Sequence, residues 1–259
     1  MSNTGRFAWY ELLSTDPKGA IAFYTEVLGW KTEPFAGSDY AMWVGSQGPL
    51  GGVAQLPDQA KQLGSPSYWQ ANVEVADLDE AIAKVKQLGG RIIHAEDVPS
   101  VGRFAVIADP QGAVLALFTP ATSMASHDTQ KHGEFSWAEL YTTDHVAALD
   151  FYRQIVGWQK LDEFDMGPMG KYFLWGREGE QLGGMMTQPQ GMTGPDGKPL
   201  PPGWMYYVTA TDFDAAFERA KAHGAKVLNG PMEVPGKQRI VQLLDPQGAA
   251  FALVTPRPV

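Results

Sequence analysis

Apolar and polar positions alternate along the chain in two ways. Short apolar runs bounded by turn residues, such as 7–13 and 113–119, have the length of about four to eight residues that is typical of β-strands. The segments that follow Asp16 and Asp77 instead space apolar residues three and four apart, which predicts amphipathic helices. Both aspartates can act as N-caps. The pattern therefore predicts a strand, a helix and further strands, and this series occurs twice in the first half of the chain.

The second half of the chain repeats the first. Phe7-Ala8-Trp9-Tyr10-Glu11-Leu12 recurs as Phe135-Ser136-Trp137-Ala138-Glu139-Leu140. Later matches keep the same order: Asp16 with Asp144, Phe23-Tyr24 with Phe151-Tyr152, Gly29-Trp30 with Gly157-Trp158, Trp43 with Trp175, Gly51-Gly52 with Gly183-Gly184, and Asp109-Pro110-Gln111-Gly112 with Asp245-Pro246-Gln247-Gly248. Such self-similarity indicates a duplication. We expect one domain at 6–120 (copy one), a linker at 121–133 and a second domain at 134–257 (copy two).

Each copy divides again into two similar halves. In copy one we expect strands at 7–13, 40–44, 52–56, 68–75, 91–94, 103–108 and 113–119, with helices that begin at Asp16 and Asp77. Copy two repeats these helices at 144–157 and 212–224. The prediction is four βαβββ modules.

These motifs resemble the vicinal-oxygen-chelate superfamily of glyoxalases, bleomycin-resistance proteins and dioxygenases. The resemblance rests on paired βαβββ units, an Asp that opens the first helix, an FY pair inside it, a G-W that ends it, and a DPQG turn before the last strand. It implies an α+β fold of tandem glyoxalase-like domains, in which curved mixed sheets surround open cups. Because this fold hosts isomerases, dioxygenases, thiol transferases and drug-sequestering proteins, it does not by itself imply a function.

The resemblance also implies where a metal would be bound. Family enzymes hold a divalent ion with His or Glu side chains from the first and last strands, and these positions carry Trp9 and Trp137, and Ala116 and Ala252, in this chain. An indole nitrogen only donates hydrogen bonds, and alanine has no donor atom, so none of the four can ligate a metal. We therefore expect no metal and no other cofactor. We expect the five histidines to have surface or structural roles.

Side chains two apart on a strand share one face, which predicts the lining of the cups. Glu11 and Glu139 are the expected catalytic residues, because a partly desolvated carboxylate flanked by Trp can act as a general base or as the counter-ion of a cationic ligand. A register shift by one residue would instead leave both glutamates in solvent or paired with Arg6 or Arg103. The expected ligand-binding residues are Trp9, Trp137, Gln70, Asn72, Ala116, Phe118, Met205, Tyr207 and Ala252. The two tryptophans are alternatively core residues.

Composition narrows the classes of function. The formal net charge of −9 argues against nucleic-acid binding, which depends on clustered Lys and Arg. Apolar runs fall far short of the ~18 residues that span a bilayer. No targeting signal is readable at the N-terminus, so we expect a cytoplasmic protein that does not bind membranes. Zero cysteines exclude disulfides and thiolate chemistry.

Two functions from different classes follow. The first is a metal-independent protein that binds a small aromatic or cationic organic ligand. The second is an enzyme, either a lyase or isomerase of the glyoxalase type that uses Glu11 or Glu139 as base, or a dioxygenase. A hydrophobic scaffold for protein contacts is a third interpretation. We expect a monomer in which the tandem copies replace a dimer, with a homodimer as the alternative.

Overall fold

The computed structural model describes residues 3–35, 40–62, 64–189, 197 and 200–258. In these residues the order strand, helix, three strands occurs four times. The modules of copy one are β1 (Phe7–Ser14), α1 (Pro17–Leu28), β2 (Lys31–Pro34), β3 (Ala41–Gly45) and β4 (Gly48–Gln55), then β5 (Tyr68–Glu74), α3 (Leu78–Gln87), β6 (Arg91–Val98), β7 (Gly102–Ala108) and β8 (Val114–Pro120). The short helix α2 (Asp58–Gln62) connects them.

Copy two has the same order. Its modules are β9 (Phe135–Thr142), α4 (His145–Val156), β10 (Gln159–Asp165), β11 (Lys171–Arg177) and β12 (Glu180–Thr187), then β13 (Gly203–Thr209), α5 (Phe213–Ala222), β14 (Lys226–Glu233), β15 (Arg239–Leu244) and β16 (Ala250–Val254). A 3₁₀ turn, η1 (Gly167–Met169), precedes β11. The four predicted βαβββ modules are confirmed.

The strands form two eight-stranded mixed sheets that do not close into barrels. Their strand orders are β2-β3-β4-β1-β5-β8-β7-β6 and β10-β11-β12-β9-β13-β16-β15-β14. Parallel pairs such as β1 with β4 and β5 with β8 alternate with antiparallel hairpins. This arrangement confirms the predicted α+β class. Within the described residues, no helix is long and apolar enough to cross a membrane.

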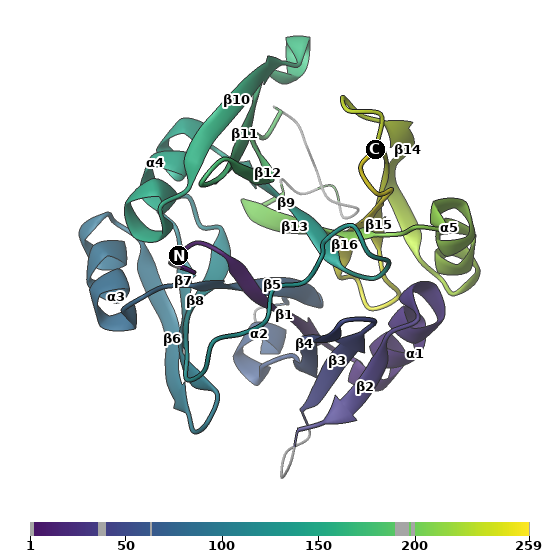
Figure 1. The fold of residues 1–259 in the computed structure, drawn as a ribbon, viewed down its shortest axis with the longest axis horizontal. Coiled ribbons are helices and arrows are strands. Elements are labelled where there is room, and N and C mark those ends of the chain that lie inside the picture. The colour runs from purple at the N-terminus through teal and green to yellow at the C-terminus, as the bar shows by residue number, and fades with distance from the viewer. Residues whose placement is uncertain (1–2, 36–39, 63, 190–196, 198–199, 259) are drawn as a thin grey trace. The chain divides into compact units, whose positions relative to one another are not determined.

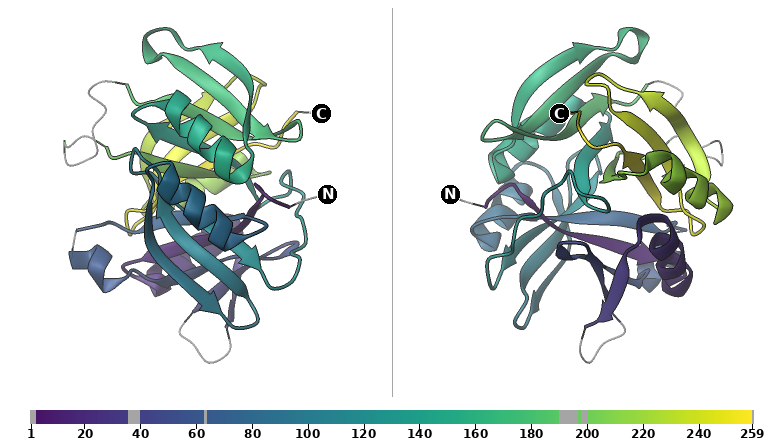
Figure 2. Two further views of the ribbon diagram at one scale, coloured as in Figure 1. Left: turned by 90° about the vertical axis from the view of Figure 1, so that its left-hand side faces the viewer. Right: turned by 45° about the vertical axis from the view of Figure 1, so that its right-hand side comes forward.

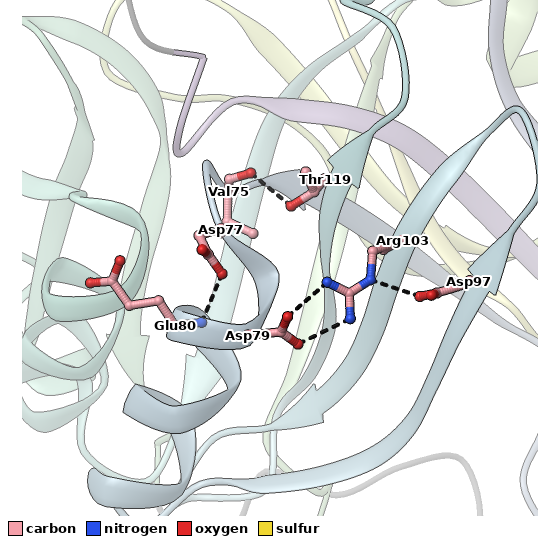
Figure 3. Close-up of polar contacts among 7 residues, drawn as sticks. All are labelled: Val75, Asp77, Asp79, Glu80, Asp97, Arg103 and Thr119. Carbon is pink, nitrogen blue, oxygen red and sulfur yellow. Dashed lines mark hydrogen bonds and ion pairs between the residues drawn. The ribbon is translucent and has the colours of Figure 1, made fainter.

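The helix boundaries follow from the capping residues that the sequence predicts. Asp16 accepts a hydrogen bond from the Gly19 amide at 3.1 Å, and Asp77 accepts one from the Glu80 amide at 2.9 Å (Figure 3). Gly29 and Gly157 end their helices with φ of 70° and 75°, a left-handed conformation that glycine adopts without a steric penalty.

Strand β2 is one element that the sequence did not predict, together with the short helix α2 and the turn η1. Its four residues, KTEP, are mostly exposed, and it lies at the edge of its sheet with β3 as its neighbour. An edge strand of this kind buries no face, so it leaves no alternating apolar pattern to read.

Packing contacts divide the chain into two compact units, and each contains segments of both copies. Unit 1 comprises residues 1–8, 71–124 and 137–204, and unit 2 comprises residues 9–70, 125–136 and 205–259. In unit 2, α1 lies beside α5 (Figure 1), and in unit 1, α3 lies beside α4 (Figure 2, left). The domain boundaries expected from the repeat stay a prediction.

Each unit contains a cluster of aromatic side chains at equivalent positions. Unit 2 packs Tyr24, Trp30, Trp43, Trp69 and Phe135 together, and unit 1 packs Tyr152, Trp158, Trp175, Trp204 and Phe7 together. In both, a tryptophan of one copy donates a hydrogen bond to the chain just before the first strand of the other copy. The Trp30 Nε1–Gly133 O distance is 2.8 Å, and the Trp158 Nε1–Gly5 O distance is 2.7 Å.

The arginines at matching strand positions tie strands to helices. Arg103 binds both carboxylate oxygens of Asp79, at 2.9 and 3.0 Å, and its Nε donates to Asp97 at 2.8 Å (Figure 3). Arg239 binds Asp214 in the same bidentate way, at 3.0 and 2.8 Å. The guanidinium groups of Arg103 and Arg239 therefore both form exposed ion pairs with carboxylates of the protein itself.

Candidate functional site

The strand register places Glu11 and its neighbours on one face of the sheet. Glu11 pairs with Gly52 across β1 and β4, and Gly52 pairs with Met42 across β4 and β3. Residues paired across a ladder point to the same face, as do residues two apart on one strand. Trp9 and Tyr40, two residues before Glu11 and Met42, therefore lie on this face as well.

Trp9, Glu11 and Tyr40 form a hydrogen-bonded group, here called the Glu11 cluster. The Trp9 Nε1 donates to the Tyr40 hydroxyl at 2.8 Å and to Glu11 Oε1 at 3.2 Å. The Tyr40 hydroxyl in turn donates to Glu11 Oε1. Both donors thus converge on a single oxygen of the carboxylate. All three residues belong to unit 2.

Copy two carries the same arrangement in unit 1. The Trp137 Nε1 donates to the Tyr172 hydroxyl at 3.4 Å, and Tyr172 hydrogen-bonds Glu139. Glu139 pairs with Gly184 in the ladder between β9 and β12, as Glu11 pairs with Gly52. We call Trp137, Glu139 and Tyr172 the Glu139 cluster.

The paired glycines of the repeat make room for these clusters. A Cβ atom on Gly52 would stand 1.8 Å from the Tyr40 hydroxyl oxygen, and a Cβ on Gly184 would stand 1.8 Å from that of Tyr172. Any larger residue would displace the tyrosine. The preceding glycine, Gly51, lies so close to β1 that a Cβ would stand 2.1 Å from the Tyr10 carbonyl oxygen. The glycines therefore allow neighbouring groups to approach closely, and Gly51 and Gly183 also lie beside a register shift in the β3–β4 and β11–β12 ladders.

Burial dominates the electrostatics of the Glu11 cluster. Desolvation raises the pKa of Glu11, and the hydrogen bonds from Tyr40 and Trp9 oppose the shift because they stabilise the ionised carboxylate. Burial and the adjacent Glu11 charge both raise the pKa of Tyr40, so its hydroxyl keeps its proton. Tyr68 has a raised pKa from burial first and from the Glu11 charge second, which places it near the same carboxylate.

The two clusters differ in their second tyrosine. Tyr68 of β5 stands near Glu11, and the matching residue in β13 is Gly203. Near Glu139 the second phenol comes from Tyr141 in β9, whose charge interaction contributes to the raised pKa of Tyr172, and its match in copy one is Leu13. Glu11 is half-buried, whereas Glu139 is only 6% exposed.

The remaining predicted ligand-binding residues lie at equivalent ladder positions. Asn72 pairs with Ala116 in copy one, and Tyr207 pairs with Ala252 in copy two, so each pair shares a face. Gln242, which pairs with Ala252, donates to the Tyr207 hydroxyl at 2.6 Å. The other three behave as follows: Gln70 and Phe118 are buried, and Met205 is half-buried. Their ligand-binding roles stay a prediction.

Glu74, two residues beyond Asn72 on β5, forms an ion pair within the protein. Its carboxylate is buried and lies 2.6 Å from the Arg6 guanidinium, which itself donates to the Met124 carbonyl. Arg6 is therefore occupied by Glu74 and does not pair with Glu11.

The side chains at the positions where the resemblance implies a metal do not have the donor atoms that would hold one. Trp9 and Trp137 present N–H donors, and Ala116 and Ala252 are methyl groups. Elsewhere in the described part of the chain, no three His, Cys, Asp or Glu side chains gather closely enough to hold an ion. His94 and His127 each have a single acidic partner, Glu96 and Glu134 respectively.

Comparison with known proteins agrees with the repeat and the fold. A model of the "Glyoxalase/Bleomycin resistance protein/Dioxygenase superfamily" matches residues 134–253, and a "Glyoxalase-like domain" model matches residues 11–118. The chain is 30% identical, over 96% of its length and 94% of the relative, to "Putative glyoxylase CFP32" of Mycobacterium tuberculosis. The chain belongs to the glyoxalase, bleomycin-resistance and dioxygenase superfamily.

Other proteins are similar over nearly the whole chain, in sequence or in fold. The "Anthracycline biosynthesis protein DnrV" of Streptomyces peucetius is 31% identical over 96% of this chain and 93% of its own. An Mn(II)-bound glyoxalase from Novosphingobium aromaticivorans has a TM-score of 0.68 at 13% identity, covering 100% of this chain and 84% of that one. The 2,2',3-trihydroxybiphenyl 1,2-dioxygenase of Sphingomonas wittichii also has a TM-score of 0.68, at 14% identity, covering 97% and 90%. These structures show the shared fold.

Tyr40 and Tyr172 are the site residues that the sequence reading missed. Each stands three positions before a matching tryptophan, in Tyr40-Ala41-Met42-Trp43 and Tyr172-Phe173-Leu174-Trp175. The recurrence of this Y-x-x-W spacing in both copies was the available signal.

Proposed function

We propose that the protein binds a small aromatic organic molecule at the Glu11 cluster through side chains alone. The observation that carries the proposal is the half-buried carboxylate of Glu11, which accepts hydrogen bonds from Trp9 and Tyr40 on one sheet face, with the phenol of Tyr68 near enough to interact with its charge. Aromatic walls with one polar anchor are typical of sites for small organic ligands.

The relatives support a small organic ligand. Two proteins similar over nearly the whole chain are named for the biosynthesis of anthracyclines, a class of small organic molecules. The side chains at the expected metal positions support binding without a metal of the family type. Indoles and methyl groups occupy the positions where relatives are expected to carry metal-coordinating side chains.

The test is ligand binding with matched variants in the two copies. Flat aromatic compounds are screened by thermal shift, and hits are measured by calorimetry on wild type, Y40F and Y172F. Y40F removes a donor to Glu11 and is expected to weaken binding about tenfold, the equivalent of one hydrogen bond of about 1.4 kcal/mol. Equal loss in both variants, or loss in Y172F alone, would contradict a site at the Glu11 cluster.

A metal titration tests the other half of the proposal. Elemental analysis of the purified protein and titration with Zn, Ni, Mn and Fe ions are expected to give no stoichiometric tight binding. Ligand affinity is expected to survive prolonged dialysis against a chelator. A tightly bound ion whose removal abolishes ligand binding would overturn a side-chain site.

A second function is favoured by one observation, the raised pKa of Glu11. A carboxylate with a raised pKa is a stronger base, and the acid formed when Glu11 takes up a proton can return that proton to a neighbouring atom of the substrate. This arrangement supports a lyase or isomerase that abstracts a proton next to a carbonyl. The test is deuterium incorporation into hydroxyacetone in heavy water, followed by NMR, which E11Q should abolish if Glu11 is the base.

A further inference from the structure

The Glu11 carboxylate has no basic side chain to neutralise it among the described residues. Burial and the hydrogen bonds from Tyr40 and Trp9 account for its electrostatic environment, and none of these is a positive charge. The two arginines that the sequence offered as possible partners of Glu11 form other ion pairs. Arg6 binds Glu74, and Arg103 binds Asp79 and Asp97. A half-buried carboxylate without a counter-ion is costly, because burial removes the water that would otherwise stabilise its charge.

The two oxygens of this carboxylate are used unequally. Trp9 Nε1 and the Tyr40 hydroxyl both donate to Oε1. Within the part of the chain that the structure describes, no group donates to Oε2. An ionised carboxylate can accept about four hydrogen bonds, so Oε2 is an acceptor that the fold holds in place and leaves to a ligand.

The surroundings of Glu11 suit a positive group better than a neutral donor. Trp9 and Tyr40 point their N–H and O–H groups at Oε1 and carry no positive charge, so they leave the carboxylate charge for a ligand to balance. The phenols of Tyr40 and Tyr68 have pKa values raised above the usual range, so they stay neutral beside Glu11 and add no competing charge. A neutral hydroxyl could satisfy Oε2, but it would leave the carboxylate charge without a counter-ion.

We propose that the Glu11 site recognises a protonated amine carried by the aromatic ligand, with the amine hydrogen-bonded to Oε2. This inference rests on the proposed ligand-binding function and adds the chemical class of the ligand. It also assigns the amine to copy one, because Glu139 is buried and the position of Tyr68 is taken by Gly203 in copy two.

The experiment compares amines with neutral molecules of the same skeleton. Tryptamine is paired with tryptophol, and phenethylamine with phenethyl alcohol, and dissociation constants are measured by calorimetry and ligand-observed NMR on the full chain at pH 7. The wild type is expected to bind each amine about tenfold or more tightly than its alcohol, since hydrogen bonds between charged groups are roughly twice as strong as neutral ones. E11Q is expected to bind both members of a pair equally.

Two further variants locate the effect. E33Q removes an exposed carboxylate of β2 and controls for net charge, so it is expected to keep the amine preference. E139Q reports on the Glu139 cluster. Loss of the preference in E139Q and its retention in E11Q would overturn the assignment to copy one.

The outcomes separate this inference from the function on which it rests. If alcohols and amines bind the wild type equally, and Y40F weakens both, the proposed function stands and the amine inference is wrong. If neither these probes nor the aromatic compounds of the wider screen bind the wild type, the proposed function fails and the inference fails with it. The comparison within the wild type needs no variant, so a folding defect in E11Q cannot hide the result.

Discussion

The hydroxyl of Tyr24 donates a hydrogen bond to Asp245 at 3.1 Å, and this contact joins the FY pair of copy one to the DPQG turn of copy two. The equivalent contact joins Tyr152 to Asp109, also at 3.1 Å. In each turn the other carboxylate oxygen accepts backbone amides, at 2.9 Å from Gln247 in copy two. The FY pair and the DPQG turn of the repeat thus contact each other, and each contact joins the FY pair of one copy to the turn of the other copy.

Replacing Tyr24 with Phe should destabilise the protein more than the same change at Tyr152. The Tyr24 hydroxyl also accepts a hydrogen bond from Trp69 Nε1 at 2.8 Å, so Y24F leaves two buried polar groups without a partner. At about 1–3 kcal/mol for each unsatisfied group, we expect a loss of roughly 2–6 kcal/mol in the free energy of unfolding. Urea denaturation provides the measurement.

Tyr152 is the matched control for this prediction. The Trp204 Nε1, which corresponds to that of Trp69, has no hydrogen-bond partner among the described residues. Y152F therefore leaves no indole stranded and should cost less than Y24F. A larger loss of unfolding free energy in Y152F than in Y24F would contradict the role assigned to the Trp69–Tyr24 hydrogen bond.

Asp109 and Asp245 should make the protein less stable as the pH rises. Burial raises the pKa of both carboxyls, so the native state holds protons that the unfolded chain has already released. Their contribution is fully present below the unfolded value of about 4 and is lost as the pH rises through the raised native pKa. The D109N/D245N variant keeps an oxygen for the backbone amides but cannot titrate.

Denaturation of this variant and of wild type between pH 4 and pH 8 checks the sign. The free energy of unfolding should fall less steeply with pH in D109N/D245N than in wild type. A slope of the same size in both proteins would show that other groups control it. Glu11, whose pKa is also raised, contributes a slope of the same sign in both and cancels from the comparison.

Separated copies should be much less stable than the whole chain. Without residues 125–259, Trp30 loses the Gly133 carbonyl and the Phe135 ring; without residues 1–124, Trp158 loses Gly5 and Phe7. Each loss removes an indole hydrogen bond, of about 1–3 kcal/mol, and aromatic contacts of about 0.5–1.5 kcal/mol. We expect each half alone to melt at a lower temperature, and mixing to restore the melting temperature. Halves that melt as the intact chain does would refute this.

The sequence predicted local features well and long-range partners poorly, for a physical reason. Alternation placed Trp9 and Glu11 on one face, and capping rules located the helix that begins after Asp16, because both patterns depend on neighbouring residues. The contact between Tyr24 and Asp245 depends instead on how modules from different copies pack, and no periodicity encodes it. Tyr40 directly precedes β3, whose pairing with β4 brings it over Gly52 toward Glu11, so only the strand register reveals the contact.

Replacing Tyr40 with Phe should raise the pKa of Glu11 further. The Tyr40 hydroxyl donates to Glu11 Oε1 and stabilises the ionised form, so its removal favours the protonated acid. The pKa is measured by ¹³C NMR of the glutamate side-chain carboxyls, with E11Q to assign the resonance. G52A should act in the same direction, because its methyl group would push the tyrosine ring away.

The copy-two variants provide the control for this titration. Y172F and G184A change the Glu139 cluster and should leave the Glu11 resonance unaltered, because burial, Tyr40 and Trp9 account for the pKa shift of Glu11 and no residue of the Glu139 cluster contributes to it. If the pKa of Glu11 falls in Y40F, the hydroxyl accepts a hydrogen bond from a protonated Glu11. The carboxyl of Glu11 would then be neutral in the ligand-free protein, and it could not serve as the counter-ion of an amine.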